Sequence, residues 1–402
     1  MRERGGEPHW SVFAAAGAAI IAVCYGFARY AYGLFEPTFR EVFSLSGAGL
    51  GLLSGLATTG YALGLLLGPV VAGRSPRGTV LASGALAAGG VATVAMAQRV
   101  PVLAVGAVLA ASSAGLASTG VAQLISRRVA GAGHRPAQTW ANTGTSFGLV
   151  LSALTPLISV GWRWSWASFA VIAALATAVT WLVLPARRDA GQHEPEGLPV
   201  SAGGGRGPAW RDCDVRRLVA SSLVLGATSA PYWNFSQGRL VEAGLAGVPA
   251  AVCWCVIGVG GPLGGLTGRL TQAAGPRRAA VILWLPWSLS LALPALPGPV
   301  LPVALVSAAL FGAAYMGLSG LFILWAVELF PRASQGVTVS FLALAAGQAA
   351  AAPVAGLLGD RVGLGPVFGL AAVGGLAGLV LLPRRRRQPG LTSAPPPSSR
   401  AW

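Results

Sequence analysis

One arginine stands inside an otherwise apolar stretch near the N-terminus, and its neighbours have side chains that can bind a ligand. Arg29 lies in a segment that is long enough to cross a bilayer, which takes about 20 residues. An ionisable side chain in such a segment is costly, so it marks a candidate functional site. At helical spacing, one face carries four polar or aromatic residues: Tyr25, Arg29, Tyr32 and Glu36. This face predicts a cavity lining in which the planar guanidinium binds a carboxylate or a similar anion.

Arg29 has two other interpretations. It can form a structural ion pair with Glu36, two turns further along the helix, or its long side chain can extend to the nearer membrane surface. The sequence leaves these alternatives open. It also leaves open whether Glu36 takes part in coupling to protons or only in an ion pair.

Other polar residues occur in apolar segments later in the chain. Tyr232, Asn234, Ser236 and Gln237 lie close together in one such segment, and Asn142 and Tyr315 lie in two others. These residues can hydrogen-bond a ligand, or they can bond to neighbouring helices. The predicted binding residues are Arg29, Tyr25, Tyr32, Tyr232, Asn234, Gln237, Asn142 and Tyr315.

The sequence offers little for catalysis or for metal binding. His9, His134 and His193 fall in predicted tails or loops, and the thiols of Cys253 and Cys255 would point to different faces of a helix. A membrane-embedded enzyme would need paired acids or a histidine cluster within the spans. A phosphate-binding loop of the Gly-x4-Gly-Lys-Ser/Thr type is also missing, which excludes ATP as the fuel. We therefore expect no enzyme activity, no cofactor and no metal.

Composition places the chain in a membrane. Its 402 residues are 54% hydrophobic and only 10% charged, with a mean hydropathy of +0.66. A soluble chain carries about 25% charged residues, so a soluble enzyme is excluded. Twelve apolar segments are predicted to be transmembrane helices: 10–35, 48–73, 79–97, 101–125, 138–160, 164–185, 215–238, 248–270, 278–297, 300–327, 334–358 and 364–383.

Arginine predicts the orientation of these helices. All 28 basic residues are arginine, and with a cytoplasmic N-terminus 22 of them fall in cytoplasmic segments against five outside. This bias predicts a multi-pass protein of the plasma membrane with both termini in the cytoplasm. It also explains the net charge of +16 without nucleic-acid binding. Four arginines at 384–387 either contact lipid headgroups or act as a stop-transfer anchor.

The two halves of the chain repeat at an offset of two hundred residues. Two glycine faces match in this way, and they are Gly60, Gly64 and Gly68 in one half and Gly260, Gly264 and Gly268 in the other. We interpret both as packing and rocking surfaces between helices. The repeat divides the chain into a bundle at 1–185, a cytoplasmic linker at 186–213, a bundle at 214–383 and a disordered basic tail at 384–402.

Twelve spans in two parallel repeats resemble the major facilitator superfamily. The stretches Gly26–Gly33, Tyr232–Ser236 and Gly161–Trp166 resemble its bacterial YbfB/YjiJ-like branch. The family's usual Gly-x-x-x-Asp-Arg-x-Gly loop is degraded at Gly73–Gly78, where the acid is missing. A better match at Gly356–Gly363, which contains Asp360, falls on the opposite side of the membrane, so we interpret it as coincidental.

The resemblance implies an all-α membrane transporter of the major facilitator fold. Such a protein is a secondary active or facilitative transporter that moves a small organic solute by rocker-switch alternating access, and Arg29 favours an anionic one. We expect a monomer whose partners are the solute and membrane lipids. A receptor or scaffold on a transporter fold is the alternative. Substrate identity and the direction of transport are beyond the sequence.

Overall fold

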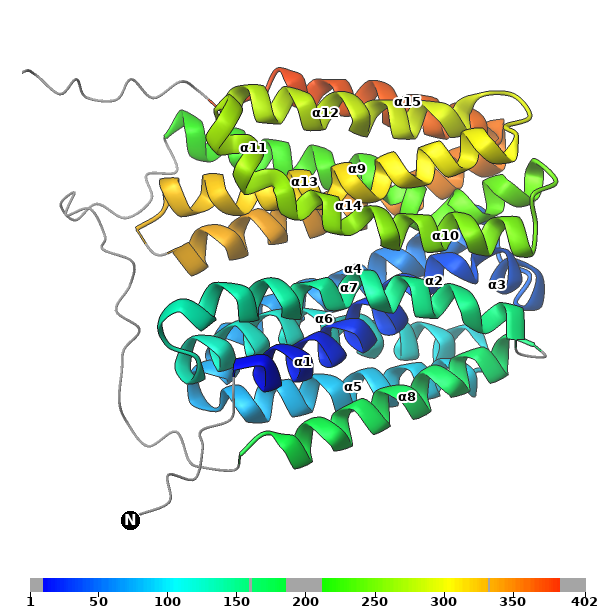
Figure 1. Ribbon diagram of the computed structural model, residues 1–402. Helices are drawn as coiled ribbons and strands as arrows, with labels where there is room; N and C mark the ends of the chain where they lie inside the picture. Colours follow the sequence, from blue (N-terminus) through cyan, green and yellow to red (C-terminus); the bar gives the residue numbers. More distant parts are fainter. Residues whose placement is uncertain (1–9, 159–160, 186–211, 332, 384–402) are drawn as a thin grey trace, which may run out of the picture.

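The molecule consists of helices arranged in two bundles (Figure 1). The structure is a computed structural model that describes residues 10–158, 161–185, 212–331 and 333–383, and these residues form no strand. The first bundle contains α1 Trp10–Ile21, η1 Ala22–Tyr30, α2 Ala31–Leu34, α3 Glu36–Val42, α4 Gly47–Arg74, α5 Pro76–Ala95, α6 Val100–Arg128, η2 Gly131–Gly133, α7 His134–Ile158 and α8 Trp162–Val183. The second contains α9 Cys213–Glu242, α10 Val248–Gly260, η3 Gly261–Leu266, α11 Thr267–Ala274, α12 Pro276–Ala292, η4 Leu293–Ala295, α13 Leu301–Leu329, α14 Ala333–Val362, α15 Leu364–Leu376 and η5 Ala377–Leu379.

The all-α prediction is confirmed for the described residues, and each predicted span coincides with one helix or with a run of consecutive helices. Within the same residues, nine of these are long and apolar enough to cross a membrane. Helices α7 and α9 are more polar, and they carry Asn142 and the group from Tyr232 to Gln237. Nearly all of the predicted linker and the whole predicted tail lie outside the described residues.

The first span changes its helical geometry in the middle. Residues Ala22–Tyr30 form a π-helix, in which the backbone N–H of Ala31 bonds to the carbonyl oxygen of Gly26, five residues back. A π-turn is wider than an α-turn, and π-helical segments occur frequently at functional sites. Side chains five residues apart, such as those of Tyr25 and Tyr30, therefore lie on the same side. The face predicted from α-helical spacing does not continue through this segment.

Most of the predicted glycine contacts join helices of the same bundle. A Cβ on Gly64 would lie 2.2 Å from the carbonyl oxygen of Ser112, and one on Gly264 would lie 2.6 Å from the backbone nitrogen of Gly317. These contacts let α4 approach α6 and let η3 approach α13. They are packing surfaces inside each bundle, and the contacts between bundles are made by other residues.

Gly268 differs from the other five predicted glycines. Nothing lies within 4 Å of the position that its Cβ would take. The reason is the 3-10 segment η3, whose three-residue period aligns Gly264 with Thr267 instead of Gly268. Thr267 makes the contact with α13, because its hydroxyl donates to the carbonyl oxygens of Gly264 at 2.6 Å and Gly317 at 3.1 Å.

Two helix pairs form the largest contacts between the bundles, and in both the backbones approach closely; α9 of the second bundle also contacts α2 and α3. Helix α4 packs on α14, and α7 packs on α10. A Cβ on Gly51 of α4 would lie 2.2 Å from the carbonyl oxygen of Ala352 in α14. A Cβ on Gly258 of α10 would lie 2.9 Å from the carbonyl oxygen of Ser146 in α7. Glycine at these positions lets helices of opposite bundles touch.

These contacts lie toward one end of the molecule. We call this the far end, where α3 lies and α4 begins, and we call the opposite end, where α1 and α9 begin, the linker end (Figure 1). Toward the linker end the joined faces separate. Asn142, one turn before Ser146 on α7, is exposed, and Gly265, two turns after Gly258, has open space around it. The bundles are thus closed at the far end and apart toward the linker end.

Candidate functional site

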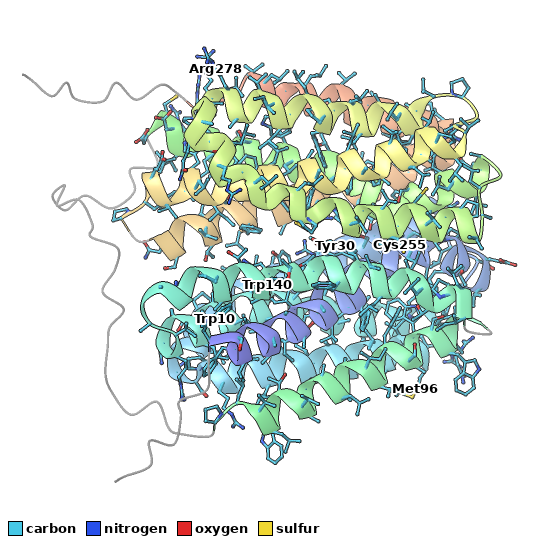
Figure 2. The ribbon with its side chains drawn as sticks, in the orientation of Figure 1. Trp10, Tyr30, Met96, Trp140, Cys255 and Arg278 are labelled. Atoms are coloured by element: carbon cyan, nitrogen blue, oxygen red, sulfur yellow. The ribbon has the colours of Figure 1, made fainter. Side chains whose placement is uncertain are left out.

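A small cavity lies where the two bundles meet. Figure 2 shows Tyr30 at this boundary between the bundles. The first bundle contributes charged, aromatic and small residues, and the second contributes three side chains from α9 and α14. The lining residues are Arg29, Tyr30, Tyr32, Gly33, Ser54, Ala57, Thr58, Ala111, Trp233, Asn234 and Gln348. The π-helical segment places Arg29 and Tyr30 together in this lining.

Arg29 is surrounded by aromatic rings. Its guanidinium carbon lies 3.4 Å from the ring centroid of Tyr61, 5.1 Å from that of Tyr30 and 5.6 Å from that of Tyr25. The negative faces of aromatic rings attract a cation, so the rings hold the guanidinium in place. They contribute no full negative charge, and the positive charge of Arg29 is not neutralised by them.

The hydrogen bonds of Arg29 leave most of its donors unused. A guanidinium has five N–H groups. In the described part of the chain one of them is bonded, because Nη2 donates to Oε1 of Gln348 at 3.2 Å. Among the same residues no carboxylate lies within ion-pair distance of Arg29. A half-buried cation with free donors, beside a cavity, is suited to binding an anion.

Glu36 does not lie beside Arg29. Phe35 leaves the helical conformation, so that Glu36 begins a new helix, α3. Its Oε1 accepts a hydrogen bond from Nε of Arg40 at 3.2 Å. The face expected from regular helical spacing is broken twice, by the π-helix and by this break. The structure therefore does not form the alternative ion pair between Arg29 and Glu36.

The structure brings three more predicted residues close to Arg29. Tyr25 is held by a hydrogen bond between its hydroxyl and that of Ser118, at 2.5 Å. Asn234 lines the cavity, and its Oδ1 accepts a short hydrogen bond from the hydroxyl of Ser54 in the opposite bundle. The ring of Tyr315 lies 5.4 Å from that of Trp233, a lining residue.

Tyr32 also lines the cavity, but its hydroxyl is already used. It donates to the carbonyl oxygen of Leu50 at 3.1 Å. Asn142 lies away from the cavity lining, exposed on α7 toward the linker end, where it accepts a hydrogen bond from Gln138 at 3.5 Å. The sequence predicts both residues to bind the ligand. In the structure the hydroxyl of Tyr32 already has a partner, and Asn142 lies outside the cavity lining.

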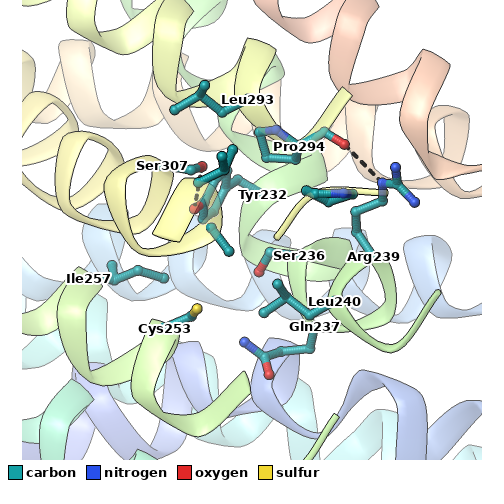
Figure 3. Close-up of a pocket in the computed structure, with 13 residues that line it drawn as sticks. Tyr232, Ser236, Gln237, Arg239, Leu240, Cys253, Ile257, Leu293, Pro294 and Ser307 are labelled. Atoms are coloured by element: carbon teal, nitrogen blue, oxygen red, sulfur yellow. Dashed lines mark hydrogen bonds between the residues drawn. The ribbon is translucent and has the colours of Figure 1, made fainter. Parts of the chain in front are cut away.

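Tyr232 and Gln237 line a different small cavity, inside the second bundle (Figure 3). The hydroxyl of Tyr232 is hydrogen-bonded to that of Ser307 at 2.9 Å, and Nε2 of Gln237 donates to the carbonyl oxygen of Ala250 at 3.4 Å. Arg239 closes one side, because its Nε donates to the carbonyl oxygen of Pro294 at 2.8 Å. The predicted polar residues of α9 therefore line two different cavities. Tyr232 and Gln237 lie in the second bundle's own cavity, and Asn234 lies in the cavity beside Arg29.

Several site residues are absent from the predicted set, and they are Tyr30, Tyr61, Trp233 and Gln348. The rings of Tyr30 and Trp233 stack across the bundle boundary, with centroids 4.0 Å apart. Sequence signals were available for three of the four, and Gln348 is a polar residue within an apolar span. The chain has only six tyrosines, and both Tyr30 and Tyr61 fall within apolar spans.

The described residues show no centre for metal chemistry. They contain no group of three or more His, Cys, Asp and Glu side chains that can hold a metal ion. The four cysteines are free thiols, and Cys255 lies at the boundary between the bundles (Figure 2).

Two helical bundles that enclose a polar cavity at their boundary have the architecture of a membrane transporter. The chain belongs to the Major Facilitator Superfamily, whose family model matches residues 18–346. No curated protein matches the chain. The YbfB/YjiJ-like branch stays a prediction.

Solved structures of similar fold are transporters. The nucleoside transporter NupG is 15% identical, with a TM-score of 0.71 over 92% of this chain and 98% of that one. The xylose transporter XylE from E. coli, in an inward-open conformation, is 16% identical, with a TM-score of 0.71 over 92% and 95%. An inward-facing bacterial homologue of the human lysosomal transporter Spinster is 17% identical, with a TM-score of 0.68 over 94% and 95%. At these identities the likeness extends to the fold alone.

Proposed function

We propose that the protein is a secondary transporter that binds a small organic anion at Arg29. The observation that carries this proposal is the half-buried guanidinium beside the cavity, with four N–H groups and a positive charge that no described carboxylate satisfies. A carboxylate supplies both the charge and the acceptor oxygens that this group lacks. Gln348 and Asn234, from the opposite bundle, line the same cavity, although the amide nitrogen of Asn234 already donates to the carbonyl oxygen of Ala230 at 2.7 Å.

Alternating access fits the way in which the bundles meet. They touch at the far end and separate toward the linker end, so the site communicates with one side of the membrane. Rocking of one bundle on the other would reverse this arrangement. Inward-open and inward-facing relatives share the fold, and the arginine distribution predicts that the linker end is cytoplasmic. We therefore infer an inward-facing state in the plasma membrane.

A panel of matched ligands tests the anion proposal. We expect carboxylates to raise the melting temperature of the purified protein in proportion to the logarithm of their concentration, since a ligand that binds only the folded state stabilises it. The corresponding amides keep the planar shape without the negative charge, the amines carry a positive charge instead, and we expect neither to have an effect. Equal protection by amides or amines would reject the anion site.

Uptake of the stabilising carboxylate, in radiolabelled form, is then measured in proteoliposomes. Uptake above that of empty vesicles is the expected result for a transporter. Binding without uptake, inward or outward, would favour the receptor alternative instead.

The proposed orientation has its own test. A reporter that is active only in the periplasm, fused after Pro383, is expected to stay inactive, because both termini are predicted to be cytoplasmic. A reporter that is active only in the cytoplasm, fused at the same residue, serves as the matched control. The opposite pattern of activity would overturn the orientation.

A further inference from the structure

An acid from the second bundle caps a helix of the first. Asp360, near the end of α14, accepts hydrogen bonds from the backbone N–H groups of Gly47 at 2.8 Å and Ala48 at 2.9 Å. These two N–H groups belong to the first turn of α4, and they have no acceptor within the helix. The side chain of Ser46 bonds only the N–H of Gly49, at 3.1 Å. The positive end of the α4 dipole also favours a carboxylate at this place.

Arg40 extends this contact into the first bundle. Its Nη1 lies 3.6 Å from Oδ1 of Asp360, while its Nε donates to Oε1 of Glu36 at 3.2 Å. The chain Glu36–Arg40–Asp360 therefore crosses the bundle boundary at the far end. We call these three residues, with the N-terminus of α4, the far-end cluster.

Glu36 is the buried member of the far-end cluster. Its side chain is 0% exposed, and Oε2 lies beside the backbone N–H of Gly238 without a well-formed hydrogen bond. Helix α9 of the second bundle covers it, so that a Cβ on Gly238 would lie 2.6 Å from Oε2. A buried oxygen without a well-formed hydrogen bond is costly, and the cost is larger when the group is charged. Separation of the bundles would expose this oxygen to water.

The titratable groups that face Glu36 come from four helices. Arg40 lies on α3, the hydroxyl of Tyr32 on α2, Glu242 on α9, and Asp360 on α14 beyond Arg40. Burial raises the pKa of Glu36 from 4.5 to about 6, although Arg40 and the backbone N–H of Gly238 oppose this shift and Glu242 adds to it. A carboxyl that water reaches keeps its ordinary pKa.

We propose that the far-end cluster is a proton-sensitive latch that holds the two bundles together at the far end. Asp360 fastens α14 to the N-terminus of α4, and Glu36 makes the closure depend on pH. This proposal goes beyond the anion site and depends only on the two-bundle fold.

The direction of the pH effect follows from linkage. The closed arrangement binds the proton of Glu36 more tightly than an open one, because only the closed arrangement buries the carboxyl. The advantage of closure is therefore fully present below about pH 4.5 and is lost as the pH rises through about 6. A pKa difference of this size changes the ratio of closed to open molecules by about ten- to thirtyfold.

Spin-label distances across the far end test the latch without any ligand. The labels are attached to cysteines at Val42 and Val362, which are 46% and 55% exposed, in a protein whose four native cysteines are replaced by alanine. In lipid nanodiscs we expect the long-distance population to grow between about pH 5 and about pH 8. Glu36→Gln is expected to stay closed throughout. The matched control Glu41→Gln, an exposed acid on the same helix, is expected to behave as the wild type.

Two further variants test whether Asp360 holds α14 to the N-terminus of α4. Asp360→Ala is expected to increase the long-distance population at every pH. Gly47→Ala keeps every charge, but its Cβ would lie 2.7 Å from Oδ1 of Asp360 and from the carbonyl oxygen of Gly356, so it should have the same effect. Distances independent of pH in the wild type, or an equal pH response in Glu36→Gln, would overturn the proton sensitivity. Unchanged distances in both Asp360→Ala and Gly47→Ala would overturn the latch itself.

Discussion

Leucine at position 64 is expected to prevent α4 and α6 from packing, and it should lower the melting temperature in detergent by about 10 °C or more. The Cβ alone would lie 2.2 Å from the carbonyl oxygen of Ser112 and 3.2 Å from the backbone of Gly115. Backbone atoms on a neighbouring helix cannot move aside as a flexible side chain can. Overpacking costs of about 1–3 kcal/mol are therefore a lower range for this position.

The matched control for Gly64→Leu is Gly268→Leu. Gly268 is the repeat partner of Gly68, and it has open space where a Cβ would stand. We expect this variant to melt within about 2 °C of the wild type, because a substitution away from packed groups changes stability little. A similar loss in both variants would mean that helix propensity, and not the close contact, determines the result.

Replacement of Arg29 is expected to remove ligand binding while leaving the fold intact. Arg29→Ala should weaken binding of the best carboxylate by about 10- to 150-fold, because hydrogen bonds to a charged group contribute about 1.5–3 kcal/mol. Arg29→Lys keeps the charge but loses the planar fork, and we expect a loss of about tenfold. Calorimetric titration measures both losses.

The melting temperature separates this role from a structural one. Arg29 bonds Gln348 and lies on aromatic rings, whereas Glu36 is paired with Arg40. We therefore expect Arg29→Ala to change the melting temperature little and Glu36→Gln to bring no rescue. A large loss of stability in Arg29→Ala that Glu36→Gln restores would contradict this arrangement. Full binding by Arg29→Ala would remove the main residue of the anion site.

The architecture was predictable because it depends on the length of apolar segments and on the internal repeat, which can both be read from the chain itself. Apolar length identifies a span wherever it occurs, and the repeat of Gly60 and Gly64 at Gly260 and Gly264 relates the two halves. These signals need no knowledge of which helices meet. The helix boundaries accordingly differ from the predicted ones by only a few residues in most spans.

The details of the site were less predictable because they depend on local changes of helical geometry. Spacing on a regular helix places Glu36 beside Arg29, but the π-helix and the break at Phe35 move it away and bring Tyr30 in. Propensities give no warning of a π-turn. A 3-10 segment likewise substitutes Thr267 for Gly268 in the contact with α13.

Contacts between the bundles were the least predictable. The match around Asp360 was interpreted as coincidental, since it falls on the opposite side of the membrane from the family's usual loop. Its carboxylate nevertheless bonds Gly47 and Ala48, more than three hundred residues earlier in the chain. Such a contact depends on how two separately packed bundles meet, and a single sequence contains no signal for that.

The unneutralised charge of Arg29 also has an electrical consequence. A positive charge within a membrane span responds to the transmembrane voltage, at about 2.3 kcal/mol per charge for each 100 mV that it crosses. The empty protein carries this charge with no described carboxylate beside it, and a bound monoanion would cancel it. Under the proposed function, voltage would act on the return of the empty protein and not on the occupied one. Net movement of the anion would then be voltage-dependent, whereas exchange of one anion for another would not.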